Sequence, residues 1–257
     1  MQPISVISLS GGLDSTSLLL CLLNKKHKVF CLSFKYGQKH ILEIDRAKKN
    51  LEFLKTLNHN ISHKIIDISS SISLLKSAIT NNDIEVPTGH YKKENMIKTV
   101  VPNRNAIFTS FLYAYALSIS NNNQIQISLG VHSGDHAIYP DCRPDFYEKI
   151  MDAFEIGNWN SKNISINLPF INFTKTQILQ ELINSCKNLE IDYNKILKNT
   201  LTSYLPNRNG VSNGDTGSDI ERILAFHELG LIDPIQYTKP WDEIVNNALE
   251  YKAKQDD

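Results

Sequence analysis

The sequence has no net charge, few cysteines and no long hydrophobic run, and these absences exclude several classes of protein. Lys and Arg together number 27, as do Asp and Glu, so the formal net charge at pH 7 is +0 and no global positive field is available to hold a nucleic acid. No apolar run approaches the roughly 20 residues that a membrane-spanning helix needs, and the first residues lack the basic and apolar regions of a signal peptide. We therefore expect a soluble, cytoplasmic protein that contacts neither a membrane nor, directly, a nucleic acid.

The four cysteines are Cys21, Cys31, Cys142 and Cys186, and they are too widely spaced for a CxxC metal site or a dense disulfide framework. Cys21 and Cys31 lie in apolar runs, which is typical of buried free thiols. Hydrophobic residues make up 41% of the 257 positions and charged residues 21%, as in ordinary globular proteins. We expect a folded chain without disulfides and without a cysteine-based zinc site.

Apolar runs and helical periodicity alternate along the chain and predict a parallel sheet covered by helices on both faces. The expected strands are Ser5–Leu9, Lys28–Phe34, Ile61–Ile68, Ile125–Leu129 and Ile164–Leu168. The expected helices are Ser15–Asn24, Ile41–Leu57, Asn105–Ser120, Pro144–Ile156, Lys175–Ser185 and a final one at Asp219–Leu229. Residues 69–100 are polar and predict an irregular excursion over the active-site edge, and Lys252–Asp257 predicts a frayed tail.

The segment Ser10-Gly11-Gly12-Leu13-Asp14-Ser15 joins the first expected strand to the first expected helix. Two glycines allow a sharp turn and a close approach to a ligand, and the N–H groups that open a helix attract anions such as phosphate. Ser10, Ser15 and Thr16 add hydroxyl donors, and Asp14 fits if Mg²⁺ bridges it to phosphate oxygens. A structural Gly-Gly turn capped by Asp or Ser would have the same local pattern, so the segment alone leaves both interpretations open.

Following a first strand, SGGLDS resembles the pyrophosphate loop of the ATP pyrophosphatases, which cleave ATP between the α and β phosphates and adenylate a substrate oxygen. The resemblance implies a Rossmann-like adenine nucleotide alpha hydrolase (PP-loop) fold, α/β, with a five-stranded, mostly parallel sheet. It also implies which residues bind ATP or pyrophosphate: Ser8, Ser10, Gly11, Gly12, Leu13, Asp14, Ser15 and Thr16, with Ser33 and Phe34 near the adenine and Asp14 on Mg²⁺ through the phosphate.

Four further segments follow in order: Phe34-Lys35-Tyr36-Gly37-Gln38-Lys39-His40, Val101-Pro102-Asn103-Arg104-Asn105, Tyr139-Pro140-Asp141-Cys142-Arg143-Pro144-Asp145-Phe146, and Lys175 at a helix start. Each has a structural alternative: a surface loop, an ordinary ion pair for Arg104, a proline turn, or a solvated lysine. Together they resemble the 7-cyano-7-deazaguanine synthases, the QueC family, from about Ile4 to Tyr237.

That family adenylates the carboxylate of 7-carboxy-7-deazaguanine, converts it with ammonia to the amide, and dehydrates the amide with a second ATP to the nitrile, a queuosine precursor. The resemblance implies a C–N bond-forming ligase in which Asp14, Arg104 and Lys175 are catalytic, the last two offsetting charge on the α-phosphate with Mg²⁺. The expected substrate-binding residues are Tyr36, Gln38, His40, Arg104, Asn105, Asp135, Tyr139, Asp141 and Arg143. Asp141 or Asp135 would read the N–H donors of the base, and Tyr139 or Phe146 would stack on its ring. We expect one domain over residues 1–257 and, by resemblance, a homodimer.

QueC proteins usually carry four cysteines that hold a structural zinc, and the segment 199–257 stands in place of that region. The ligand positions are here Ser203, Asn213, Thr216 and Asp219, a set that does not make a stable zinc site, so we expect no zinc and expect Asp219 to cap the final helix. A hydrogen-bonded loop with unchanged chemistry is one interpretation. Another is a QueC-like enzyme of antiviral defence that transfers the adenylated acid to a protein amine, and a third, disfavoured by the intact loop, is an inactive nucleotide-binding partner.

Overall fold

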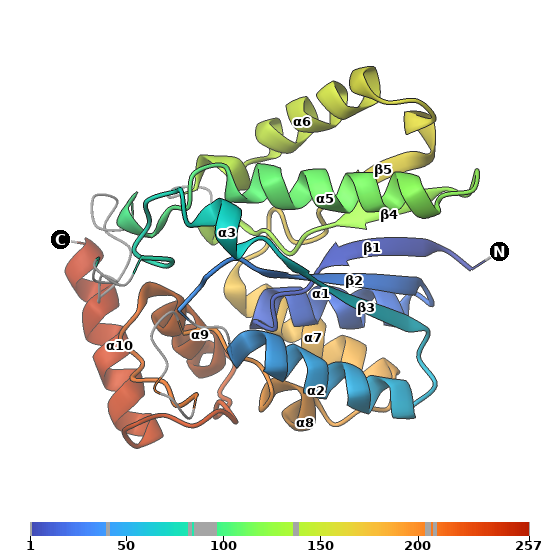
Figure 1. The fold of residues 1–257 in the computed structure, drawn as a ribbon. Coiled ribbons are helices and arrows are strands. Elements are labelled where there is room, and N and C mark those ends of the chain that lie inside the picture. The colour runs from blue at the N-terminus through green and yellow to red at the C-terminus, as the bar shows by residue number, and fades with distance from the viewer. Residues whose placement is uncertain are drawn as a thin grey trace.

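The structure is a computed structural model that describes residues 2–39, 42–81, 84, 97–135, 139–203, 207 and 210–256. One sheet is built from β1 (Ile4–Ser8), β2 (Lys28–Lys35), β3 (Ile61–Asp67), β4 (Ile125–Ser128) and β5 (Ile164–Asn167). The strand order is β3-β2-β1-β4-β5, and every pairing is parallel (Figure 1). This confirms the predicted fold class. The order reverses between β1 and β4, where open α/β sheets bind their ligands.

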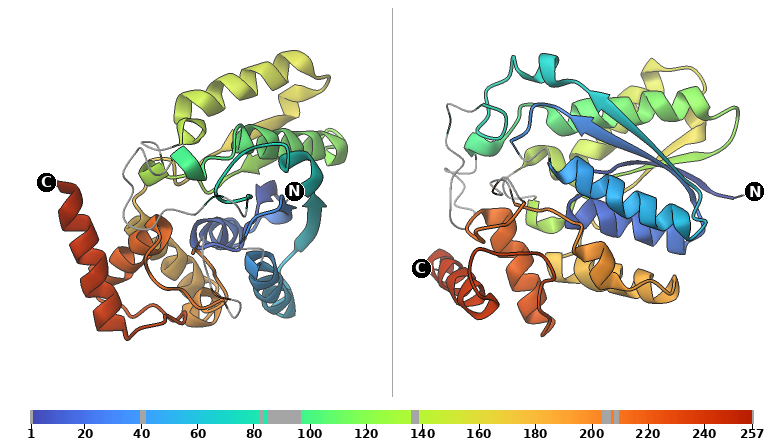
Figure 2. Two further views of the ribbon diagram at one scale, coloured as in Figure 1. Left: turned by 60° about the vertical axis from the view of Figure 1, so that its left-hand side comes forward. Right: turned by 60° about the horizontal axis from the view of Figure 1, so that its bottom comes forward.

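Helices cover both faces of the sheet (Figures 1 and 2). On one face lie α1 (Leu13–Asn24), α2 (Leu42–Thr56), α7 (Lys175–Asn188) and α8 (Tyr193–Leu197). On the other lie α3 (Ser69–Ile72), α5 (Arg104–Ile119) and α6 (Pro144–Gly157). Successive residues of β1 point to opposite faces of the sheet: Val6 packs in the core on the α5 face and Ile7 in the core on the α1 face. Both are fully buried, as expected for a strand covered by helices on both faces.

The C-terminal part of the chain forms two packed helices beyond the carboxyl ends of the strands, α9 (Gly217–Glu228) and α10 (Trp241–Asp256). Ile220 and Ile223 of α9 pack against Ile244, Val245 and Ala248 of α10. The helix predicted at 219–229 is confirmed as α9, but it is not the last one, because α10 follows it. The prediction of a frayed tail from Lys252 was wrong as far as Asp256, where α10 ends. The apolar stripe of α10 is narrow and its other positions are mostly polar, so tertiary contact with α9 stabilises a helix that the pattern alone did not indicate.

The other expected elements are confirmed, with bounds that differ by at most three residues. Residues 69–100 contain α3 and a 3₁₀ turn at Ile97–Thr99, while residues 82, 83 and 85–96 lie outside the described part of the chain. All four cysteines are buried and unbridged. In the described residues, no helix combines the length and the apolar character needed to cross a membrane.

Candidate active site

A cavity of about 210 Å³ lies at the carboxyl ends of β1, β2 and β4, the edge expected for a ligand site. It gathers residues from the β1–α1 loop, the end of β2, and the starts of α5, α7 and α9. The predicted site residues in its wall are Ser8, Ser10, Gly12, Leu13, Asp14, Ser15, Phe34, Tyr36, Arg104, Asn105, Tyr139 and Lys175. The fold thus brings most of the predicted phosphate-binding and substrate-binding residues to one place.

The loop at the start of α1 is held in shape by its own hydroxyls. The backbone N–H groups of Ser10 and Gly11 donate to Ser15 Oγ at 3.2 and 3.3 Å, and that of Gly12 donates to Ser10 Oγ at 3.2 Å. Gly11 has φ +99° and a Cβ there would collide with the backbone oxygen of Glu43, so only glycine fits. No side chain caps α1 at Gly12, so the donors of its first turn remain suited to an anion.

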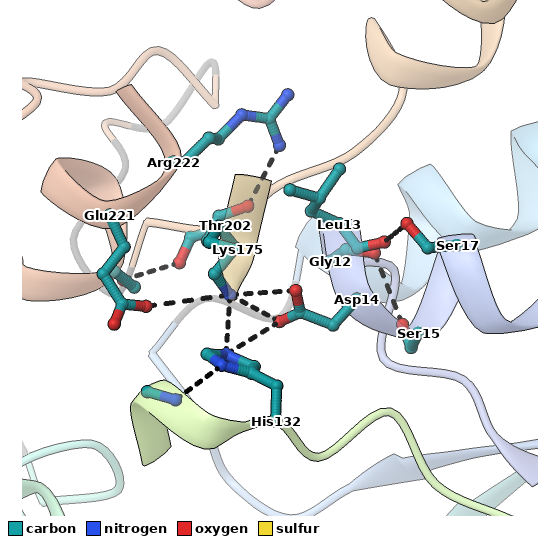
Figure 3. A network of polar contacts seen from close by, with 12 residues as sticks. Gly12, Leu13, Asp14, Ser15, Ser17, His132, Lys175, Thr202, Glu221 and Arg222 are labelled. Atoms are coloured by element: carbon teal, nitrogen blue, oxygen red, sulfur yellow. Dashed lines mark hydrogen bonds and ion pairs between the residues drawn. The ribbon is translucent and has the colours of Figure 1, made fainter. Parts of the chain in front are cut away.

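A cluster of charged side chains surrounds Lys175, the first residue of α7 (Figure 3). Its Nζ donates to both carboxylate oxygens of Asp14 at 2.8 Å, lies 3.0 Å from His132 Nε2, and is 3.7 Å from Glu221 Oε2. The backbone N–H of Gly134 donates to the other ring nitrogen of His132 at 3.1 Å. Burial would by itself raise the pKa of Asp14, but the charge of Lys175 and its hydrogen bonds outweigh it and the pKa lies below its usual range. Asp14 is therefore ionised at neutral pH.

An aromatic wall faces the same cavity. Phe34 and Phe108 are stacked, with ring centroids 4.1 Å apart, and Tyr36 meets Phe108 edge-on at 5.5 Å. Burial raises the pKa of Tyr36 to about 12, with the Arg104 guanidinium opposing the shift, so the phenol stays neutral. Tyr139 is fixed by a 2.9 Å hydrogen bond between its hydroxyl and that of Thr99. Flat rings beside phosphate-binding groups suit a ligand that joins a planar base to a phosphate.

Several predicted residues lie outside the cavity wall: Gly11, Thr16, Ser33, Gln38, Asp141 and Arg143. Ser33 donates to Leu9 O at 2.6 Å, and Gln38 braces the end of β2 through Tyr36 N (2.8 Å) and Phe34 O (3.0 Å). Asp141 accepts from the backbone N–H of Asn105 at 3.3 Å, at the start of α5.

Arg143 is exposed before α6, and Phe146 packs edge-on to Tyr147 rather than lining the cavity. His40 lies outside the described residues, and so does the side chain of Asp135. Ligand binding by these residues stays a prediction.

Several residues that line the cavity or enter its charged cluster had no role predicted from the sequence. His132 follows the fourth expected strand, at the edge of the sheet where a ligand was expected, and this position was the available signal for it. Glu221, Thr202 and Ser218 come from the C-terminal segment, where the predicted residues were the zinc positions. Phe108 sits one helical turn after Arg104, so the helix start already indicated it.

Three of the four positions predicted to match the family's zinc ligands, Ser203, Thr216 and Asp219, form a hydrogen-bonded cluster around the fully buried Asp219. Its carboxylate accepts from the hydroxyls of Ser203 (2.9 Å), Thr216 (2.5 Å) and Ser212 (2.8 Å). Asn213 is exposed, so Ser212 takes the place expected for it. Burial raises the pKa of Asp219, and these hydrogen bonds oppose the shift. No group of three His, Cys, Asp or Glu side chains within the described ranges is arranged to hold a metal ion.

The prediction that Asp219 caps the last helix was wrong. Thr216 is the N-cap of α9, and Asp219 is its third residue, with Thr216 Oγ1 accepting from Asp219 N and the Asp219 carboxylate accepting from Thr216 N. This reciprocal pair is a capping box, which satisfies two backbone donors at once. Asp219 therefore joins the helix start to the loop at Ser203.

Asp219→Ala is expected to lower the free energy of unfolding by about 2–3 kcal/mol, because it leaves buried hydroxyls without their acceptor and removes half of a capping box. Urea denaturation followed by circular dichroism measures the change. Asp215→Ala is the matched control, since Asp215 lies in the same loop and is half-buried, and it should cost less than about 1 kcal/mol. Equal losses in the two variants would contradict the role of the Asp219 cluster.

Comparison with known proteins decides the family. The model of the family described as "Queuosine biosynthesis protein QueC" matches residues 4–230. The chain belongs to the QueC family. A curated QueC-family relative, 7-cyano-7-deazaguanine synthase 1 of Colwellia psychrerythraea, is 41% identical over 232 residues, which are 90% of this chain and 97% of the relative.

Two further 7-cyano-7-deazaguanine synthases match as broadly. That of Hahella chejuensis is 40% identical over 91% of this chain and 92% of its own length. That of Methanoregula boonei is 38% identical over 91% of this chain and 98% of its own length. The resemblance inferred from the YGQKH, VPNRN and YPDCRPDF segments is therefore confirmed, and so is the prediction of a QueC-type synthase.

Proposed function

We propose that this QueC-family chain uses ATP to adenylate the carboxylate of 7-carboxy-7-deazaguanine and converts it with ammonia, through the amide, to 7-cyano-7-deazaguanine. The observation that carries the proposal is a single cavity in which an uncapped helix start and the Asp14–Lys175 pair adjoin the stacked Phe34 and Phe108. Phosphate-binding and base-binding surfaces are both needed for this reaction. The names of the relatives supply the substrate class.

In the first half-reaction, a substrate carboxylate oxygen attacks the α-phosphorus of ATP. The new bond is P–O to the substrate, and the bond that breaks joins the α-phosphorus to the oxygen bridging to the β-phosphate, so pyrophosphate leaves. The loop from Ser10 to Ser15 would retain that pyrophosphate, while Arg104 and Lys175 would offset the charge that develops on the α-phosphate. No base is required, because the substrate acid is already ionised.

Asp14 has the properties of a Mg²⁺ ligand beside phosphates: an ionised carboxylate, partly accessible, in the cavity wall. Bound there with phosphate oxygens, Mg²⁺ would neutralise part of the triphosphate charge. The residues themselves keep Asp14 in place, since Lys175 holds both of its oxygens.

In the second half-reaction, ammonia attacks the activated carbonyl carbon, a C–N bond forms, and the C–O bond to AMP breaks. Phe34, Tyr36, Phe108 and Tyr139 would hold the flat base, and Asn105, which donates to Cys142 Sγ at 3.2 Å, fixes Cys142 at the cavity wall. Asp141 would act on the base indirectly, by holding the start of α5. In the second ATP-driven step, the amide oxygen would attack the α-phosphorus of another ATP and pyrophosphate would leave. The C–O bond would then break, and loss of AMP with that oxygen and of two protons in all would give the nitrile.

One experiment tests the proposal: protein, Mg-ATP and the deazaguanine acid are incubated with and without ammonium, and the products are identified by mass spectrometry. Ammonium-dependent nitrile supports the proposal. An ammonium-independent mass gain on a co-encoded protein would support transfer to a protein amine instead. If no pyrophosphate is released in the presence of the acid, the result would favour the third interpretation, an inactive nucleotide-binding partner. The expected homodimer stays a prediction that light scattering tests.

A further inference from the structure

A segment almost two hundred residues after the Ser10–Ser15 loop in the sequence lies against that loop in the structure and lines the same cavity. The backbone N–H of Leu201 donates to the carbonyl of Gly11 at 3.0 Å. Leu201 and Thr202 line the cavity together with Ser10, Gly12 and Ser15. The C-terminal segment is thus bonded directly to the loop that would hold pyrophosphate.

The Thr202 hydroxyl is set up as a donor. Nη1 of Arg222 donates to Thr202 Oγ1 at 3.0 Å (Figure 3), and because a guanidinium can only donate, the Thr202 oxygen is the acceptor in this contact. The hydrogen of the Thr202 hydroxyl can therefore be donated to another acceptor, and none of the described residues accepts it. Since Thr202 is in the cavity wall, a ligand bound there can supply that acceptor.

Arg222 is fixed and charged. It has no exposed surface, and it makes two bonds to Asp233, from Nε at 2.6 Å and from Nη2 at 2.9 Å. Burial opposes its charge, but the Asp233 carboxylate raises the pKa of Arg222 above its ordinary value. A hydroxyl that accepts from a cation becomes a stronger donor itself, because the two hydrogen bonds polarise each other.

We propose that Thr202 donates a hydrogen bond to a phosphate oxygen of ATP and of the pyrophosphate product, and that Arg222 positions and polarises the Thr202 hydroxyl. This inference rests on the proposed function. The ligand must be an acceptor and an anion, because Thr202 presents a donor beside the uncapped start of α1 and near Lys175. Phosphoryl oxygens meet both conditions. The C-terminal segment thereby becomes part of the phosphate site.

Thr200 provides a matched control, because it receives the same Arg222 Nη1 at 2.8 Å but is outside the cavity wall. Its own hydroxyl donates to Leu197 O at 2.7 Å. Thr200→Val and Thr202→Val therefore remove the same kind of acceptor from Arg222 with the same change of shape. They differ in whether a donor to the cavity is lost.

The experiment is titration of the purified full chain with Mg-pyrophosphate by calorimetry. Thr202→Val should weaken Kd by about tenfold or more, as expected for a hydrogen bond to a charged group, whereas Thr200→Val should stay within about twofold and Thr202→Ser should restore wild-type binding. Thermal melts check folding, and Thr202→Ala serves if the valine variant does not fold.

Wild-type Kd in Thr202→Val would overturn this inference while leaving the proposed function intact. Equal weakening in both valine variants would also overturn it, because Arg222 would then act through structure alone. Failure of the wild type to bind either pyrophosphate or ATP would overturn the proposed function and this inference together.

Discussion

Lys175→Met should lower kcat for pyrophosphate release by about 10²–10³-fold, as does the loss of one preorganised charge-stabilising group in other active sites. Lys175 is only 8% exposed and holds both oxygens of Asp14, so its charge acts in surroundings that screen it weakly. Without it, Asp14 would lose the cation that both of its oxygens contact, so the negative charge near the phosphates would increase. Stopped assays of pyrophosphate release at saturating ATP and substrate acid measure kcat for the variant and the wild type.

The matched control is Lys187→Met, because Lys187 lies on the same helix, α7, and is exposed. It should change the rate by less than about twofold, as surface changes usually do. Circular dichroism must show that both variants are folded. A Lys175→Met enzyme that keeps more than a tenth of wild-type kcat would remove Lys175 from the charge-stabilising role.

Local patterns were enough to predict the sheet and the position of the Ser10–Ser15 loop between the first strand and the first helix. The apolar strands and the helical spacing of residues 41–57 depend on neighbours in the sequence, and the structure confirms them as β1 to β5 and α2. Helix α10 was missed because its burial is against α9, a contact that no local pattern contains. A polar sequence with a narrow apolar stripe becomes a helix only once that partner surface exists.

The candidate site was predictable where a motif marked it. Asp14 and Lys175 meet across 161 positions, and the family resemblance had already assigned both. His132 and Glu221 join them because η2 (Ser133–Asp135) and α9 begin at the same cavity, which follows from topology rather than from spacing. Thr202 likewise reaches the site through the bond between Leu201 and Gly11. Long-range contacts of this kind are set by the fold as a whole.

The Asp219 cluster shows where an aligned spacing fails. The correspondence with the family's zinc region placed a ligand position at Asn213, but Ser212 is the buried residue that donates to Asp219. Ser212 also accepts from the backbone N–H of Gly214 at 2.9 Å, and Gly214 has φ +77°. This tight turn directs Ser212 inward and leaves Asn213 at the surface. Hydrogen bonds need a different geometry from metal ligation, so the side chains around Asp219 need not keep the spacing of zinc ligands.

Asp233→Asn should lower the free energy of unfolding by about 3–5 kcal/mol, the usual cost of leaving one partner of a buried ion pair without its counter-charge. Asp233 and Arg222 are both fully buried at their side chains, and Tyr237 Oη donates to the same carboxylate at 2.8 Å. The amide cannot accept from Arg222 at both atoms, so the cation would stay buried with too few acceptors. Urea denaturation at pH 7 measures the loss.

An exposed ion pair gives the control that separates burial from charge. Asp152 lies 3.6 Å from Lys149 on α6 with both side chains largely exposed, so Asp152→Asn should cost less than about 0.5 kcal/mol. The double variant Arg222→Met with Asp233→Asn removes the buried charge itself and should lose at least about 1.5 kcal/mol less than the sum of the two single variants. Strict additivity would mean that the two side chains stabilise the fold independently. Because Arg222 also holds Thr202 in the cavity wall, the double variant should bind pyrophosphate weakly even where it remains folded.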